Sequence, residues 1–323
     1  MRVLPLAPVL AALAACTGGE RACVPPDRLA ATAKNGMRWV PPGRYLIGAR
    51  PERPEEGPPR PVSLPGFWIG QTEVTNAEFA RFVAATGYRT LAERRPDPAL
   101  YPGVDPARLV PSSLVFVGVP PGEAPRGPGS WWRVVPGADW RHPEGPGSSI
   151  AGREQAPVVH VGHADALAYA RWAGGDLPSE AEWEAAARGG LTARSYSWGD
   201  SPPGGEGGLT PRANVWQGAF PVEDKGGDGY KARVAPVACF AANGYGLYDM
   251  AGNVWEWTAS PAIGALWSAD DPPETRARAR HLIKGGSFLC ADNYCYRYRP
   301  AARSSGPVDG GASHIGFRIV RRG

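Results

Sequence analysis

The sequence predicts an α+β fold with little regular secondary structure. Glycine and proline, with 43 and 36 of the 323 residues, are far above their average usage and favour turns over long elements. Three stretches carry clear helix start and stop signals, whereas short runs with a strand pattern recur along the chain. Twelve tryptophans and a hydrophobic share of 43% supply apolar surface for a core held by aromatic packing.

Three helices are predicted from their caps. Thr75 begins a capping box that opens a helix ending at Gly87. A second helix is expected from about His163 to Ala173, where two glycines follow. Ser179 begins another capping box, and its helix ends at Gly189. The apolar faces of the three helices consist of Phe79, Phe82 and Val83; of Ala166, Leu167, Ala170 and Trp172; and of Trp183, Ala186 and Ala187.

The rest of the chain is predicted as strands, turns and loops. A strand–turn–strand pattern covers 37–48, and a short strand covers 65–70. The segment 51–61, rich in proline, glutamate and arginine, is expected to be an exposed loop. The long stretch 95–158 is interpreted as an ordered loop that lines a site, because its tryptophans argue against disorder. Short strands and turns are expected from Ser195 onward, and residues 37–323 are interpreted as one domain.

The N-terminus has the pattern of an export signal. An apolar run over 3–15 is too short to span a membrane and ends in small residues before Cys16. This pattern resembles a bacterial lipobox, in which Cys16 would carry a lipid anchor; the alternative is an ordinary secretory signal. We therefore expect a signal peptide over 1–22, a linker over 23–36, and an exported protein that is periplasmic or membrane-anchored.

Charge gives little support to a nucleic-acid partner. The 35 basic residues nearly balance the 31 acidic ones, and no basic run is interleaved with aromatic residues. We therefore expect no nucleic-acid partner.

The five cysteines include one close pair. Cys290 and Cys295 flank a short turn that can bring both sulfurs to one point. Two thiolates without a third Cys or a His nearby do not make a structural zinc site, but they suit copper(I). Arginines at 297, 299 and 303 are expected to raise the local positive potential and favour the thiolates. The alternative is a local disulfide, with a second one between Cys23 and Cys239; spacing does not decide between the two.

A second group of residues is rich in oxygen ligands. Asn214 precedes Gly226-Gly-Asp228-Gly-Tyr230, and Asp249 precedes Gly252-Asn-Val254-Trp-Glu256. Carboxylates, an amide and backbone carbonyls freed by glycine are what a hard cation such as calcium binds. The alternative is that these clusters are ordinary turns.

Several segments together resemble the formylglycine-generating enzymes, also called sulfatase-modifying factors. The C-terminal run Gly285-Gly-Ser-Phe-Leu-Cys290 and the following Tyr294-Cys295-Tyr-Arg-Tyr-Arg299-Pro-Ala-Ala-Arg303 are similar to the active-site signature of that family. Further similar segments occur in family order, and they are 66–79, 135–149, 177–184 and 252–258. The wider superfamily, which includes iron-dependent sulfoxide synthases, generally lacks the cysteine pair.

The resemblance implies a degenerate C-type-lectin-like fold and an oxidase. It implies that the enzyme uses O2 to convert a cysteine to Cα-formylglycine in a Cys-x-Pro-x-Arg stretch of an unfolded sulfatase. Cys290 and Cys295 would hold copper(I), and Ser287 would place a hydroxyl beside the pocket. Calcium would bind at two sites, formed by Asn214, the Val215 carbonyl, Asp228 and the Tyr230 carbonyl, and by Asp249, the Gly252 and Val254 carbonyls and Glu256. The alternative function is a non-catalytic exported binding module on the same scaffold.

Overall fold

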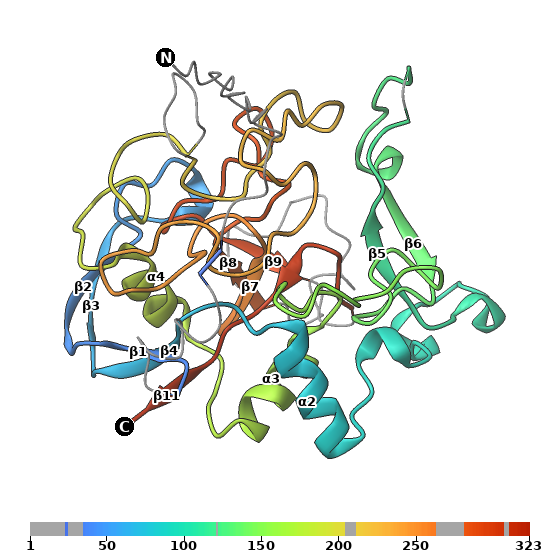
Figure 1. Ribbon diagram of the computed structural model, residues 1–323, viewed down its shortest axis with the longest axis horizontal. Coiled ribbons are helices and arrows are strands. Elements are labelled where there is room, and N and C mark those ends of the chain that lie inside the picture. Colours follow the sequence, from blue (N-terminus) through green and yellow to red (C-terminus); the bar gives the residue numbers. More distant parts are fainter. Residues whose placement is uncertain (1–22, 25–34, 121, 204–210, 263–280, 307–309) are drawn as a thin grey trace, which may run out of the picture.

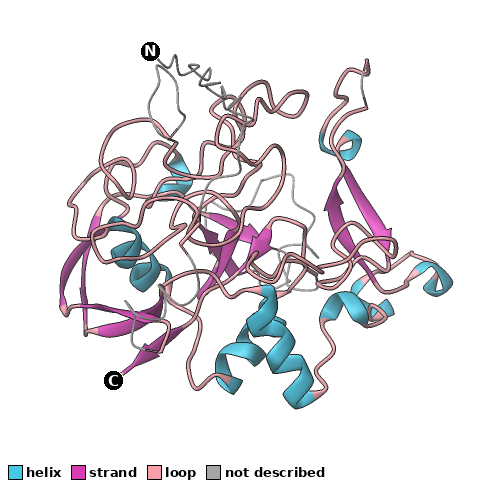
Figure 2. Cartoon of the chain, in the orientation of Figure 1, coloured by secondary structure: helices cyan, strands magenta, loops and turns pink. Residues whose placement is uncertain are grey.

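The computed structural model describes residues 23–24, 35–120, 122–203, 211–262, 281–306 and 310–323. The predicted signal peptide over 1–22 and residues 25–34 of the predicted linker lie outside the described residues. In the part of the chain that the structure describes, no helix combines the length and the apolar character needed to cross a membrane. Most of the described chain is loop (Figure 2).

The three predicted helices are confirmed. They are α2 (Asn76–Thr86), α3 (His163–Trp172) and α4 (Glu180–Arg188). The hydroxyl of Thr75 accepts from the amide of Glu78 at 3.3 Å, and Gly87 ends α2 at a φ of 66°. Such a left-handed residue is where glycine stops a helix at little cost. Short 3₁₀ helices are η1 (Pro54–Glu56), η2 (Leu91–Glu93), η3 (Pro98–Leu100), η4 (Pro106–Arg108) and η5 (Pro128–Ser130).

The apolar face predicted for α3 is partly wrong. Ala166 and Ala170 are buried, but Trp172 is 44% exposed and Tyr169 takes the central buried position. The ring of Tyr169 stacks on Phe79 of α2 at a centroid distance of 5.9 Å. Tertiary packing against α2 therefore sets the buried side of this short helix, which its own periodicity marks only weakly.

The strands form four small sheets within the described residues. They are β1 (Met37–Val40), β2 (Gly43–Ile47), β3 (Arg60–Leu64), β4 (Phe67–Gly70), β5 (Ser112–Phe116), β6 (Trp132–Pro136), β7 (Trp255–Pro261), β8 (His281–Lys284), β9 (Ser304–Gly306), β10 (Ile315–Gly316) and β11 (Val320–Arg322). One sheet has the antiparallel order β1-β4-β11. Another has the order β10-β7-β8-β9, in which only β10–β7 is parallel. The pairs β2–β3 and β5–β6 complete the set.

The sequence interpretation missed two features of the strands. The strands at 37–40 and 43–47 form as predicted, but they pair with β4 and β3 rather than with each other. The stretch 95–158, interpreted as loop, contains the antiparallel β5–β6 pair, which stands at one side of the molecule (Figure 1). A long loop separates β5 from β6 in the sequence. The alternation of apolar and polar residues in each strand therefore did not reveal that the two strands pair.

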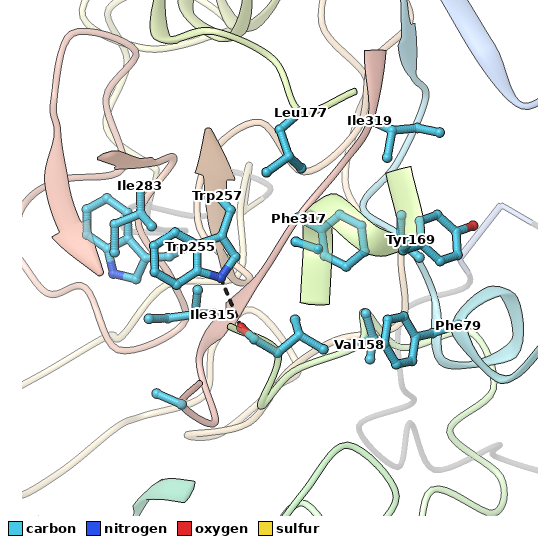
Figure 3. Close-up of a cluster of buried hydrophobic side chains, with 14 of the residues drawn as sticks. Phe79, Val158, Tyr169, Leu177, Trp255, Trp257, Ile283, Ile315, Phe317 and Ile319 are labelled. Carbon is cyan, nitrogen blue, oxygen red and sulfur yellow. Dashed lines mark hydrogen bonds between the residues drawn. The ribbon is translucent and has the colours of Figure 1, made fainter. Parts of the chain in front are cut away.

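The largest core cluster lies between helices α2 and α3 and the β7 sheet (Figures 1 and 3). Phe79 sits among the rings of Trp140, Tyr169 and Phe317, at centroid distances of 5.2, 5.9 and 6.4 Å. The indole nitrogen of Trp257 donates to the carbonyl oxygen of Val161 at 2.9 Å, so this buried tryptophan has a polar partner. The aromatic core thus ties the helices to the sheet whose strands lead into the candidate site.

Candidate active site and cation-binding loops

The cysteine pair lies in a turn that follows β8. Backbone bonds fold the turn: Cys290 N donates to the carbonyl of Ser287 at 2.9 Å, and Tyr296 N donates to the carbonyl of Ala291 at 3.0 Å. Gly286, at a φ of 73°, precedes the turn, and a Cβ there would lie 2.9 Å from the backbone nitrogen of Tyr298. Only glycine permits that close approach between the two arms of the turn.

The turn brings the two sulfurs together, as the sequence predicts. Cys290 and Cys295 form a disulfide with a Cα–Cα distance of 4.7 Å, and their exposed fractions are 1% and 9%. Among the described residues, no group of three or more His, Cys, Asp or Glu side chains is placed to hold a metal. Once reduced, the pair would offer two soft sulfur donors, a donor set that fits copper(I). Copper binding by this pair stays a prediction.

Ser287 is fully buried directly before the turn. Its hydroxyl accepts from the backbone nitrogen of Leu289 at 3.2 Å, which fixes the oxygen within the segment that leads to Cys290. Its role beside the pocket stays a prediction.

The three arginines that were expected to raise the positive potential around the cysteines each have an acidic partner. Arg297 pairs with Glu55 at 2.7 Å, and Arg299 pairs with Glu56 at 2.5 Å. Arg303 lies at 2.5 Å from a carboxylate oxygen of Glu180 in α4. Charge neutralisation by carboxylates from other elements removes most of the field that three unpaired guanidinium groups would create.

The segment 51–61 is mostly exposed, as composition suggested, but it contains η1 and one buried carboxylate. Glu56 of η1 is 2% exposed, and its carboxylate accepts from Arg299 and from the backbone nitrogen of Glu52 at 2.7 Å. Arg53 also donates to the carbonyl of Cys295 at 3.1 Å. The acidic residues of this segment are thus the counterions of the cysteine segment, a role that the local sequence does not show.

Tyrosines next to the cysteines are a second feature that the sequence interpretation missed. The hydroxyls of Tyr196 and Tyr296 lie 2.9 Å apart, and the hydroxyl of Tyr298 donates to the carboxylate of Asp292 in the turn. Burial and the Asp292 carboxylate raise the pKa of Tyr298, so its phenol stays protonated. The alternation of tyrosine and arginine at 296–299 was the sequence signal that could have pointed to these tyrosines.

The tryptophan-rich stretch does border the cysteine turn, as predicted. Tyr294, 47% exposed in the turn, stacks on Phe220 at 4.2 Å between ring centroids. Trp131, at the end of η5, meets the edge of Tyr294 at 6.1 Å. An aromatic surface thus lies beside Cys295.

In the first predicted calcium loop, the Asp228 carboxylate is held by the backbone of the residue that follows Asn214. Asp228 is 1% exposed, and its two carboxylate oxygens accept from the backbone nitrogens of Val215 and Tyr230 at 3.1 and 2.9 Å. The amide oxygen of Asn214 is buried and has no hydrogen-bond partner among the described residues. Burial raises the pKa of Asp228 to about 6. A buried carboxylate beside an unpaired amide oxygen fits a hard cation.

The second predicted calcium loop fits less completely. Asp249 accepts from Ala238 N at 2.7 Å, and burial raises its pKa to about 6. Glu256, however, is already bound by Arg318 at 2.6 and 2.7 Å and by the indole nitrogen of Trp183 at 2.7 Å. Its role as a ligand, with those of Gly252 and Val254, stays a prediction.

A second disulfide ties the start of the described chain to these loops. Cys23 and Cys239 are bonded, and Val24 N donates to the carbonyl of Ala238 at 3.0 Å. Cys23 packs in one cluster with Tyr230, Ala235 and Phe240. The Cys23–Cys239 bond is the second disulfide that the sequence analysis gave as an alternative.

Comparison with known proteins places the chain in a family. The family model described as the sulfatase-modifying factor enzyme 1-like domain matches residues 25–323. A formylglycine-generating enzyme of Mycobacterium tuberculosis is 48% identical over 294 residues, which cover 87% of this chain and 96% of that protein. The chain belongs to the formylglycine-generating enzyme family. As a member of the formylglycine-generating enzyme family, it is an oxidase.

A second curated relative agrees with this assignment, and a solved structure shares the fold. The formylglycine-generating enzyme of Mus musculus is 42% identical over 293 residues, which cover 87% of this chain and 73% of that protein. The solved structure of PvdO from Pseudomonas aeruginosa superposes with a TM-score of 0.56 at 24% identity, over 88% of this chain and 94% of PvdO. The predicted α+β fold, the degenerate C-type-lectin-like fold of formylglycine-generating enzymes, is confirmed. The family assignment also favours an enzyme over the non-catalytic binding module.

Proposed function

We propose that this formylglycine-generating enzyme is a copper-dependent oxidase that uses O2. Its substrate would be a cysteine in a Cys-x-Pro-x-Arg stretch of an unfolded sulfatase, and its product Cα-formylglycine. The observation that carries the proposal is the convergence of Cys290 and Cys295 in a buried turn. The family names support the formylglycine product, and the soft donor pair supports copper(I).

The residues around Cys290 and Cys295 would hold the two sulfurs in place and shield the reacting thiol from water. Bound copper(I) would supply a centre for O2 reduction and for holding the substrate thiolate. Cys290 and Cys295 must first be reduced, because only thiolates bind the metal. The buried setting excludes water from the reacting thiol. The exposed ring of Tyr294, which packs on the buried rings of Phe220 and Trp131, offers a contact for an extended polypeptide beside Cys295.

We propose that calcium stabilises the loops of this fold. The Asn214–Tyr230 loop supplies a buried carboxylate and an unpaired amide oxygen, and Asp249 supplies a second buried carboxylate. These loops have few strand neighbours, so an ion bound to several of their oxygens would replace the missing backbone ladder. Glu256 would serve through an oxygen that it shares with Arg318.

We further propose that the enzyme is exported and meets its substrate outside the cytoplasm. The apolar segment before Cys16 supports export, and lipidation of Cys16 would anchor the protein to a membrane. The Cys23–Cys239 disulfide is consistent with an oxidising compartment.

A mass measurement tests the proposed reaction. The reduced, copper(I)-loaded protein is incubated with O2, a thiol reductant and a Cys-x-Pro-x-Arg peptide, and we expect the peptide to lose about 18 Da as the thiol becomes an aldehyde. Replacing Cys290 or Cys295 with Ser should abolish the conversion. The matched control is the double variant Cys23→Ser/Cys239→Ser, which removes the other disulfide and should keep the activity. No mass loss with the fully loaded wild-type protein would refute the proposal.

A further inference from the structure

A chain of oxidisable rings begins in the segment that carries the cysteine pair. Tyr298, which is 1% exposed, packs in the same core cluster as Cys290 and Cys295. Its ring lies 6.1 Å from that of Tyr196 at an interplanar angle of 26°. The ring of Tyr196 in turn stacks on Trp198 at 5.2 Å and 6°. Each neighbouring pair is thus in stacking range.

The outer end of this chain reaches the protein surface. Trp198 is partly exposed, and its indole nitrogen donates to the carbonyl of Ser201 at 2.9 Å. The inner end carries a proton acceptor, because Asp292 accepts from the phenol of Tyr298 and is itself exposed to solvent. Tyrosine and tryptophan are, with the sulfur residues, the side chains that lose one electron most easily. A tyrosine does so far more readily when a hydrogen-bonded base takes its proton.

Tyr196 is the junction of the chain. Besides its two ring contacts, its hydroxyl lies 2.9 Å from that of Tyr296, the residue that follows Cys295. The ring of Tyr296 also lies 5.4 Å from that of Tyr298. Both contacts from the cysteine segment therefore converge on Tyr196, from which one stacked step leads to Trp198.

We propose that Tyr298, Tyr196 and Trp198 form a one-electron relay that carries stray oxidising equivalents from the cysteine pair to the protein surface. The proposal rests on the proposed function, because O2 chemistry at the pair is the source of those equivalents. Without such a path, an O2-derived oxidant that fails to meet substrate would oxidise the cysteines to sulfinic and sulfonic acids, which are not readily reversed.

The electrons and protons of the relay balance. The oxidant at the cysteine pair takes one electron from Tyr298, whose proton passes to Asp292. Tyr298 regains its electron from Tyr196 and its proton from Asp292. The proton of Tyr196 passes through the hydroxyl of Tyr296, which is partly exposed, to water, and it returns by the same path when Tyr196 takes an electron from Trp198. Finally a small thiol at the surface gives one electron to Trp198 and releases one proton, while the reduced oxygen species takes up a proton. Two thiyl radicals formed in this way combine into a disulfide.

The test measures where oxidation ends up when substrate is absent. The copper-loaded protein is treated with hydrogen peroxide, and the oxidation of each residue is mapped by peptide mass spectrometry. We expect wild-type protein to carry its oxidation mainly at Trp198. Tyr196→Phe should shift it several-fold toward Cys290 and Cys295, although it keeps the ring. Freeze-quenched samples should show a tryptophan radical by electron paramagnetic resonance, which the variant loses.

The matched control is Tyr169→Phe, a buried tyrosine in the core outside the relay. It should show the wild-type oxidation pattern, and equal thermal unfolding of both variants would exclude a folding defect. The same pattern in wild-type, Tyr196→Phe and Tyr169→Phe protein would overturn the relay, even if peptide conversion succeeds. The expected shift in an enzyme that fails to convert the peptide would leave the relay intact and refute the proposed reaction instead.

Discussion

Single buried residues in this protein owe their ionisation states to their surroundings. The fully buried ring of His160 lies 2.7 Å from the hydroxyl of Ser113 and 2.8 Å from the carbonyl oxygen of Pro143. Burial lowers the pKa of His160 to about 4, against the opposing effect of the Asp139 and Glu144 carboxylates. The ring therefore stays neutral in the folded protein at pH values where an unfolded histidine takes up a proton.

This difference predicts how stability depends on pH. The unfolded chain binds more protons than the folded one between about pH 6.5 and pH 4, so the contribution of neutral His160 is complete above this window and is lost as pH falls through it. Replacing His160 with Gln should therefore reduce the drop in unfolding free energy between about pH 7 and pH 5 by about 2 kcal/mol. Urea unfolding at both pH values measures the drop.

The control for this prediction is His142→Gln, because the side chain of His142 is 42% exposed. It should show nearly the same drop in unfolding free energy as the wild type. Equal drops in the wild type and the His160 variant would contradict the account of this residue.

Among the secondary-structure elements, η1 has a larger part than its three residues suggest. Its Glu56 and the partner Arg299 are each 1% exposed in their side chains, so η1 is joined to the cysteine segment by a buried ion pair. Arg297 and Glu55 form a parallel pair nearer the surface, with side chains 26% and 14% exposed. Breaking a buried pair leaves an uncompensated charge away from water, whereas a surface pair contributes little.

The two pairs therefore predict unequal losses of stability. Glu56→Gln should lower the unfolding free energy by about 3 kcal/mol, because Arg299 loses its buried counterion and keeps only the more exposed Glu52 carboxylate at 3.6 Å. The neighbouring change Glu55→Gln should cost less than about 1 kcal/mol. Urea denaturation of both variants gives the comparison. A similar, small cost for both would show that η1 does not anchor the cysteine segment in this way.

Elements with local signals could be predicted from the sequence, and elements set by distant partners could not. The capping boxes at Thr75 and Ser179 located α2 and α4 to within a residue, because caps are satisfied by side chains three positions away. The β5–β6 pair and the buried Glu56 depend on residues far along the chain. At the site, the resemblance located Cys290 and Cys295, but the carboxylates that neutralise the arginines and the tyrosines around the pair emerged only from the fold.

For the whole molecule, the described loops are joined by few strands and by the long-range Cys23–Cys239 disulfide. The largest described sheet has four strands, and the Cys23–Cys239 bridge closes a loop of 216 residues in sequence separation. The buried carboxylates of Asp228 and Asp249 lie in such loops, and burial raises the pKa of each. Cations at these carboxylates would offset the free-energy cost of burying their negative charges in the folded protein.

Calcium removal should therefore destabilise the entire fold. We expect chelation to lower the melting temperature by several degrees and added calcium to restore it in a concentration-dependent way, since a ligand of the folded state stabilises by mass action. Asp228→Asn should weaken the response to calcium, whereas the exposed-site change Glu154→Gln should leave it intact. Differential scanning calorimetry measures this response. A melting temperature that is the same with chelator and with calcium would contradict the role of the ion.

The central claim is that Cys290 and Cys295 are a reducible, metal-binding pair rather than a structural bridge. The most direct test is titration of the mildly reduced protein with copper(I) against a competing chelator, combined with X-ray absorption at the copper edge. We predict one copper per chain bound by two sulfurs, and no such site in Cys290→Ser or Cys295→Ser protein. A pair that resists reduction, or one that is reduced but binds no copper, would contradict the claim.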